Sequence, residues 1–100
     1  MTRNANRVHR DPATIARLEA LIADLSNGAR VELTLDDGSQ LRGIVAARPI
    51  LQLFYGPDGS EGSNAVVRLE PLGDDPFDVS VPPRDLWLDT ITGIRDLGPP

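Results

Sequence analysis

The stretch NGARVELTLDDGSQLRGIVAARPILQL, residues 27–53, decides the fold of this 100-residue chain. Apolar and polar side chains alternate over residues 30–36, which predicts a strand with one buried face. An aspartate followed by Gly38 predicts a hairpin turn, because glycine adopts a positive φ without steric cost. The next predicted strand, residues 39–48, carries Gly43 at its middle. A glycine there allows close approach of another backbone and sharp bending of the strand.

An amphipathic helix is predicted before this stretch, over about residues 12–26. Its apolar side chains recur every three or four positions and form one stripe, which is typical of a surface helix packed on a core. Asp11 is suited to accept the unpaired amides of the first turn, and Pro12 suits the first helical position. Gly28 fits the left-handed position just beyond the helix end. The stripe consists of Ile15, Leu18, Leu21, Ile22 and Leu25.

Three more short strands are predicted after residue 49, because apolar segments recur between clusters of turn-forming residues. They cover residues 50–55, 65–72 and 91–97. Between them we expect a flexible, glycine-rich loop at residues 56–64 and a single helical turn at residues 84–88. The pattern leaves open whether Phe77–Val81 forms an additional strand.

These elements make one domain, residues 11–97, preceded by a flexible arm at residues 1–10. The arm is rich in arginine and poor in apolar residues, so it has little surface to bury. One helix followed by about five strands predicts a mainly β fold. We expect a small, strongly bent, five-stranded antiparallel barrel capped by the helix, since near closure protects the edge strands.

The composition excludes several kinds of chemistry. The chain has no cysteine and no lysine, which excludes thiolate metal sites, cysteine nucleophiles, Schiff bases and a P-loop lysine. Residues 1–50 hold seven arginines and six acids, whereas residues 51–100 hold three arginines and nine acids. An acidic domain is a poor general binder of nucleic acid. No signal peptide or membrane segment is evident, so we expect a cytoplasmic protein.

The remaining polar and aromatic candidates favour structural roles. His9, the single histidine, lies in the predicted arm and is expected to be a solvated surface residue. The clustered aspartates fall where turns are predicted and lack the spacing of an EF-hand. No catalytic residue, metal site or cofactor is therefore predicted. Trp87 and Phe54 are expected to pack in the core or, as the sharper alternative, to form an oligomer interface.

The pattern V-x-L-x-L-x-D-G-x-x-L-x-G-x-V, which follows a helix and Asn27-Gly28, resembles the first Sm motif of Sm and Sm-like proteins. The segment DTITGI, residues 89–94, looks like the turn and last strand of bacterial Sm-like barrels. The chain most resembles a small uncharacterised bacterial family with a variant Sm-like barrel. The motif positions are Val31, Leu33, Leu35, Asp37, Gly38, Leu41, Gly43 and Val45.

This resemblance implies a ring-forming protein that binds single-stranded, uridine-rich RNA. Sites of that family use an aspartate and an asparagine after the bent second strand, and an arginine-glycine pair in the second motif. Here residues 46–52 read AARPILQ and residues 92–95 read TGIR, so these groups are absent or displaced. RNA or partner contacts are expected at Tyr55 and three arginines, unless the arginines only pair with Glu32 and Glu70 on a solvated sheet face. The three are Arg42, Arg48 and Arg68.

Three functional hypotheses remain. The first is a non-enzymatic Sm-like module for self-association and protein interaction, working as a homodimer or small homo-oligomer. The acidic charge and the departures from the RNA-site pattern favour it. The second is single-stranded RNA binding by a diverged Sm-like barrel. The third is an enzyme, for which the sequence offers no motif.

Overall fold

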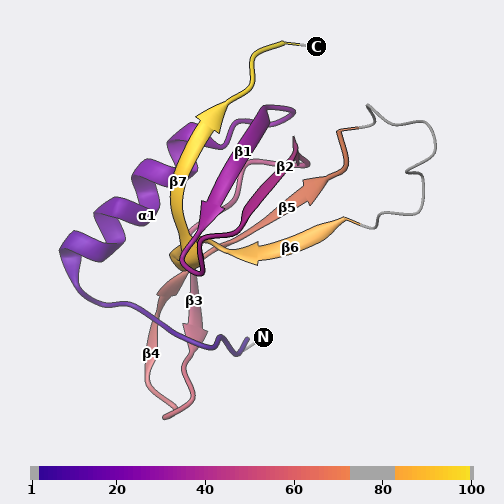
Figure 1. Ribbon diagram of the computed structural model, residues 1–100. Coiled ribbons are helices and arrows are strands. Elements are labelled where there is room, and N and C mark those ends of the chain that lie inside the picture. Colours follow the sequence, from indigo (N-terminus) through magenta and orange to yellow (C-terminus); the bar gives the residue numbers. More distant parts are fainter. Residues whose placement is uncertain (1–2, 73–82, 100) are drawn as a thin grey trace.

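The computed structural model describes residues 3–72 and 83–99, and shows one helix followed by short strands (Figure 1). None of its helices in these residues is long and apolar enough to cross a lipid bilayer. The open question of a strand at Phe77–Val81 lies outside the described residues. In chain order the elements are α1 (Pro12–Asp24), β1 (Arg30–Leu35), β2 (Gln40–Val45), β3 (Gln52–Tyr55), β4 (Glu61–Asn64), β5 (Val66–Glu70), β6 (Arg84–Trp87), the 3₁₀ turn η1 (Leu88–Thr90) and β7 (Ile91–Asp96).

The helix α1 begins as its sequence predicts and ends at Asp24, two residues before the predicted end. The Asp11 carboxylate accepts a hydrogen bond from the Thr14 amide at 3.0 Å, and so satisfies one of the unpaired donors of the first turn. After the helix, Gly28 adopts a φ of +77°, which only glycine adopts without strain. The Gly28 amide then donates to the Val45 carbonyl at 2.8 Å. This bond ties the end of the helix to the end of β2.

Strands β1 and β2 form the predicted hairpin, with Leu33 opposite Leu41 and Val31 opposite Gly43. Its turn places Gly38 at a φ of +87°, and the Asp37 carboxylate accepts a hydrogen bond from the Ser39 amide at 2.9 Å. The hairpin is the centre of a five-stranded antiparallel sheet with the order β6-β5-β2-β1-β7. The five-stranded antiparallel sheet is thus confirmed.

The apolar core lies between this sheet and the helix. Leu33 and Val45 are fully buried, as the alternation in β1 and β2 predicts. Two residues of the predicted helix stripe, Leu18 and Leu25, are fully buried in the same cluster. Burial of each such side chain stabilises the fold by about 1.5–3 kcal/mol relative to exposure. The helix and the five-stranded sheet therefore share one buried apolar cluster.

The strands β3 and β4 form a separate two-stranded sheet, which extends away from one end of the five-stranded sheet (Figure 1). A single residue, Ala65, separates β4 from β5, so one segment of chain contributes to both sheets. In the described residues β6 and β7 end the five-stranded sheet on opposite sides and do not pair with each other. The predicted closed barrel is therefore not seen in this part of the chain.

Two local predictions are wrong. The loop expected at residues 56–64 is regular at its end, where β4 pairs with β3 through Phe54 opposite Gly62. The helical turn expected at residues 84–88 is the strand β6, and helical geometry begins only at Leu88. Both segments are short, and their strand conformation depends on partners elsewhere in the chain: β6 pairs with β5.

Gly43 provides the space that the sheet needs to curl. A Cβ atom at this position would lie 2.7 Å from the Glu70 carbonyl oxygen and 3.2 Å from the Leu69 Cβ atom, both in β5. We expect Gly43→Ala to lower the free energy of unfolding by about 1–3 kcal/mol, because β2 and β5 must move apart. Urea denaturation followed by circular dichroism measures the change.

Gly93→Ala is the matched control for this substitution. A Cβ atom at Gly93 would meet Thr34 atoms no closer than 3.7 Å, which is ordinary van der Waals contact. We expect the urea midpoint of this variant to lie close to that of the natural chain. Equal midpoints for Gly43→Ala and Gly93→Ala would contradict the account of Gly43.

Candidate functional site

Residues 3–10, the N-terminal arm, lie along both edges of the β3–β4 hairpin. On the β3 side, the Ala5 amide donates to the Tyr55 carbonyl at 2.9 Å, and the Tyr55 amide donates to the Arg3 carbonyl at 2.7 Å. On the β4 side, the His9 amide donates to the Ser63 carbonyl at 2.9 Å, and the Ser63 amide donates to the His9 carbonyl at 2.7 Å. The arm, expected from the sequence to be frayed, here supplies partners to the outer edges of a two-stranded sheet.

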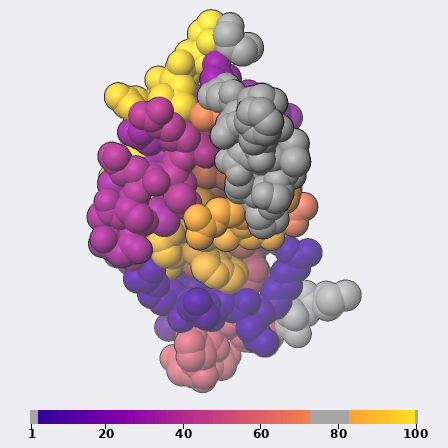
Figure 2. All heavy atoms as spheres, turned by 45° about the vertical axis from the view of Figure 1, so that its right-hand side comes forward, coloured from indigo at the N-terminus to yellow at the C-terminus, as the bar shows by residue number. Residues whose placement is uncertain are grey.

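Between these two pairings the arm crosses the hairpin at two glycines. A Cβ atom at Gly62 would lie 2.9 Å from the Val8 Cβ atom and 3.0 Å from the His9 nitrogen. A Cβ atom at Gly56 would lie 3.1 Å from the Val8 Cγ2 atom. Figure 2 shows the indigo atoms of the arm across the surface between the pink hairpin and the orange-yellow C-terminal residues. Only residues without side chains at these two positions leave room for Val8.

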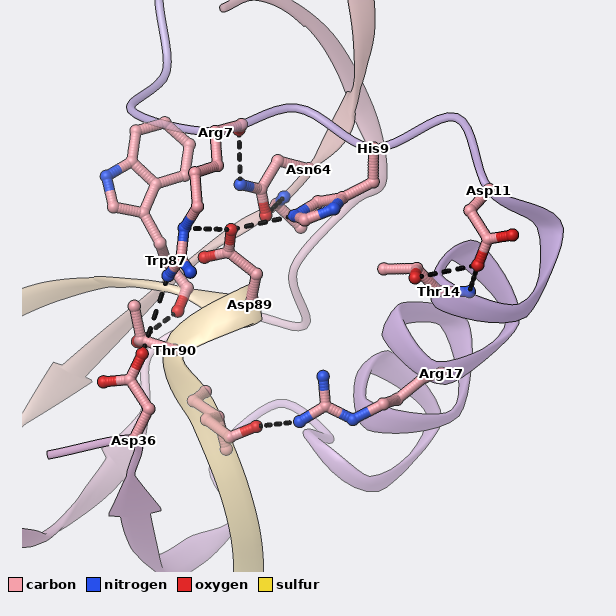
Figure 3. Close-up of polar contacts among 12 residues, drawn as sticks. Arg7, His9, Asp11, Thr14, Arg17, Asp36, Asn64, Trp87, Asp89 and Thr90 are labelled. Atoms are coloured by element: carbon pink, nitrogen blue, oxygen red, sulfur yellow. Dashed lines mark hydrogen bonds and ion pairs between the residues drawn. The ribbon is translucent and has the colours of Figure 1, made fainter. Parts of the chain in front are cut away.

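The Asp89 carboxylate anchors the centre of the arm. Its side chain is only 5% exposed, and its Oδ2 atom lies 3.2 Å from Arg7 Nε and 2.9 Å from His9 Nε2. Arg7 also reaches the Asp36 carboxylate at 3.6 Å. Figure 3 shows Asp89 between Arg7 and His9, with the arm passing over it. His9 was expected to be solvated, but its side chain is 22% exposed and faces this carboxylate.

Neighbouring hydrogen bonds fix the position of this anchor. The buried Asn64 donates through Nδ2 to the Arg7 carbonyl at 3.0 Å, while its Oδ1 atom accepts from the Ala65 amide at 2.9 Å. The Thr90 hydroxyl donates to the Trp87 carbonyl at 2.6 Å and closes the 3₁₀ turn that carries Asp89. Asn64 fixes the arm at Arg7, and the Thr90 bond fixes the turn that carries Asp89. The carboxylate therefore has one defined orientation relative to the arm.

A buried carboxylate between a guanidinium and an imidazole binds cationic side chains in a defined geometry. A histidine paired with a carboxylate also occurs in general-base catalysis, where a nucleophile must lie within hydrogen-bond reach. The ion-pair partners of Asp89, Arg7 and His9, are both arm residues, which indicates that the carboxylate holds the arm. No group of three or more potential metal ligands is found in residues 3–72 and 83–99.

The arginines predicted for RNA or partner contact do not converge. Arg42 Nε lies 2.7 Å from Glu32 Oε2, and Arg95 Nη2 reaches the other oxygen of Glu32 at 3.2 Å. Arg68 on β5 pairs with Asp85 on the neighbouring strand β6 at 2.9 Å. Arg48 instead binds the end of the helix, where its Nη2 atom donates to Ser26 Oγ at 2.9 Å. Arg42 thus pairs with Glu32, one of the two acids expected, whereas the ion-pair partner of Arg68 is Asp85. Contact of these arginines with RNA or a partner stays a prediction.

Of the aromatic candidates, Phe54 is 3% exposed and contacts Trp87 edge to face, with ring centroids 5.2 Å apart. Within this chain Phe54 belongs to the interior, and Trp87 is half-buried against it. Tyr55 is half-buried, and its backbone is the part that receives the arm. The predicted oligomer interface at Phe54 and Trp87 stays a prediction, with the Trp87 side chain as its more accessible member.

Sequence reasoning missed the residues that make this site: Arg7, His9, Asn64 and Asp89. The only signals for them were the unpaired acid within an otherwise apolar turn and the alternation of Arg7 and His9, which puts both side chains on one face of an extended chain. Neither signal joins residues 80 positions apart in the sequence. The contact of Asp89 with Arg7 and His9 depends on the tertiary structure, which brings the arm and the 3₁₀ turn together.

The strand order, the bend at Gly43 and the helix across the core define a variant of the Sm-like fold. The chain matches the family described as "Domain of unknown function (DUF3247)" over residues 2–97, and it belongs to this family. It is similar to XC5848 from Xanthomonas campestris, whose crystal structure is described as adopting a novel variant of the Sm-like motif. The two are 35% identical with a TM-score of 0.87, covering 98% of this chain and 100% of the other. No match was found among the curated proteins.

We predict that Asp89→Asn loosens the arm. The amide carries no charge to pair with the Arg7 guanidinium, so the free energy of unfolding should fall by about 1–3 kcal/mol. Hydrogen exchange at the Ala5 and His9 amides should accelerate more than exchange in the core. Asp85→Asn is the control, because its pair with Arg68 is exposed on both sides and such pairs contribute under about 1 kcal/mol. Equal effects of the two substitutions would contradict the anchoring role.

The pairing of Glu32 makes the free energy of unfolding depend on pH. The Arg42 hydrogen bond lowers the pKa of this carboxyl, partial burial opposes the shift, and the charge of Arg95 adds to the lowering. A carboxyl whose pKa is lowered by folding stabilises the protein above the unfolded pKa, and this contribution is lost as the pH falls through the folded pKa. We expect Glu32→Gln to be less stable at pH 7, with the difference from the natural chain shrinking below about pH 4.5. Urea midpoints measured from pH 7 to pH 3 test this; a difference that stays constant would contradict it.

Proposed function

We propose that this protein is a non-enzymatic, cytoplasmic Sm-like module that associates with further copies of itself and presents the assembly to a protein partner. The observation that supports this most directly is the order of the five-stranded sheet. In the described residues β6 and β7 each have a strand neighbour on one side only. An open strand edge offers a row of amides and carbonyls that a strand of another chain can pair with.

The backbone of β7 has donors suited to such pairing. The Leu97 amide donates to the Arg30 carbonyl of β1 at 2.8 Å. Because backbone groups alternate along a strand, the amides of Ile94 and Asp96 point away from β1. At the other end of the sheet, the Leu88 amide donates to the Ala65 carbonyl, so the amides of Asp85 and Trp87 point away from β5. The two edges are on opposite sides of the sheet, so pairing β6 of one copy with β7 of the next would continue the sheet from chain to chain.

The charge distribution favours a protein partner over RNA. The formal net charge is −5, and binding of nucleic acid requires several phosphates to be neutralised. Glu32 is shared by Arg42 and Arg95, and Arg68 is paired with Asp85. An RNA phosphate would therefore compete with carboxylates that are already in place. RNA binding remains the alternative that an experiment has to separate from self-association.

Blocking the β7 edge tests the self-association. We expect the natural chain at micromolar concentration to show a mass above that of the 10.8 kDa monomer in light scattering. Asp96→Pro removes an amide that points away from β1, so it should shift the mass towards the monomer while leaving the β1–β7 pairing in place. Asp96→Ala keeps this amide and should associate like the natural chain. A monomeric natural chain would reject the proposal.

The RNA alternative is tested by fluorescence anisotropy with labelled oligo-U and oligo-A at low salt. We expect no saturable binding below about 100 μM, which corresponds to ordinary non-specific affinity. If oligo-U binds saturably and the Arg42→Ala variant loses this binding, the proposed protein partnership is rejected and RNA binding is the function.

A further inference from the structure

The surface under the arm, here named the arm seat, consists of Tyr55, Gly56, Gly62, Ser63 and Asp89. It combines three features that together fit an extended peptide. Two strand edges offer backbone partners, two glycines leave space for one branched side chain, and one buried carboxylate binds the guanidinium and the imidazole on either side of that side chain. The matching peptide is Arg-Val-His, residues 7–9 of the same chain. This is the β-strand addition seen in many peptide complexes, with side-chain specificity added.

The contacts of the arm do not depend on the helix that follows it. In the described part of the chain, the hydrogen bonds and ion pairs of residues 3–9 lead to the end of β1, to the hairpin and to the 3₁₀ turn, and none leads to α1. Only Arg10 and Asp11 connect the arm to the first residue of the helix, Pro12. An arm from another molecule would therefore find the same partners at the same distances. Exchange of an identical element between copies is a low-cost route to a dimer, because no new contact has to evolve.

We propose that the arm seat binds the N-terminal arm of a second copy of this chain, in exchange for the chain's own arm. The occupant seen in the structure is the basis for this choice, since an identical arm has the Val8 that fits above Gly56 and Gly62 and the Arg7 and His9 side chains that meet Asp89. The proposal is independent of sheet-edge pairing, which uses β6 and β7. The arm seat involves neither of these strands, so each contact can be removed without the other.

Complementation between two full-length variants tests the exchange. Val8→Asp leaves the arm seat intact but gives an arm whose new carboxylate would lie among the contacts to the two glycines and near Asp89. Gly62→Ala leaves the arm intact but blocks the seat, because the added Cβ would meet Val8 and the His9 backbone at 2.9 and 3.0 Å. The chain has no cysteine, so an Ala47→Cys substitution at an exposed position provides one fluorescent label. The labelled Val8→Asp chain is titrated with the Gly62→Ala chain, and both are first checked by circular dichroism.

We expect a saturable rise in anisotropy only for this mixture, because it alone joins a free seat to a free arm. Titration with the double variant Val8→Asp/Gly62→Ala should give no such rise, since neither arm nor seat is functional in the titrant. Association through the sheet edges would appear equally in both titrations and is thereby separated. Equal responses of the two titrants would overturn the proposal.

If either variant does not fold, hydrogen exchange on the natural chain tests the same inference. Exchange requires that the arm leave its seat while the core remains folded. The Ala5 and His9 amides should then exchange at least about 100-fold faster than the Val45 amide, which is bonded to Ala29 inside the fold. Exchange of all three at the rate of global unfolding would show that the arm does not open separately, and would also overturn the proposal.

Discussion

The close approach of β2 and β5 at Gly43 is the constraint on which the rest of the structure depends. With a Cβ atom in this position, the carbonyl oxygen of Glu70 would be 2.7 Å away. At this point the two strands are in close backbone contact, and the apolar face of the sheet packs in the buried core. Leu18 and Leu25 of the single helix then suffice to cover that face, and ten side chains from helix, sheet and 3₁₀ turn form one buried cluster. In a flatter sheet, one 13-residue helix would leave part of the same face in water.

A glycine also permits a close backbone contact at the N-terminal arm. Gly62 allows the arm backbone to pass close to the β3–β4 hairpin, as Gly43 allows β5 to lie close to β2. The consequences differ because the contacts around the two glycines differ. Gly43 is surrounded by apolar side chains that leave water together, so separation there would expose the core. The arm is held by a few backbone bonds and by one carboxylate with two cationic partners, and such contacts open without loss of the core.

Local signals in the sequence predicted the elements whose conformation is decided locally. Asp11 sets the start of the helix through its side chain and Gly38 sets the hairpin turn through its φ angle, so the start of the helix, β1 and the start of β2 were predicted close to their observed bounds. The strand β6 follows two prolines and has four residues, and its conformation is set by pairing with Val67 and its neighbours in β5. A helical turn was therefore predicted there. The arm contacts were missed for the same reason, since a polar segment shows no periodicity and its partners are distant in sequence.

The acidic residues in the second half of the chain illustrate how placement changes their chemical role. A count of charges there predicts a surface that repels nucleic acid, and the exposed Glu61 and Glu70 fit that description. Asp85 and Asp89 are four residues apart but differ in environment: the first pairs with Arg68 in solvent, whereas the second is buried under the arm. The arm both covers the Asp89 carboxylate and supplies its Arg7 and His9 partners, so burial and pairing depend on the same segment. An arm of identical sequence supplies the same two partners to Asp89 whether it belongs to the same chain or to another copy.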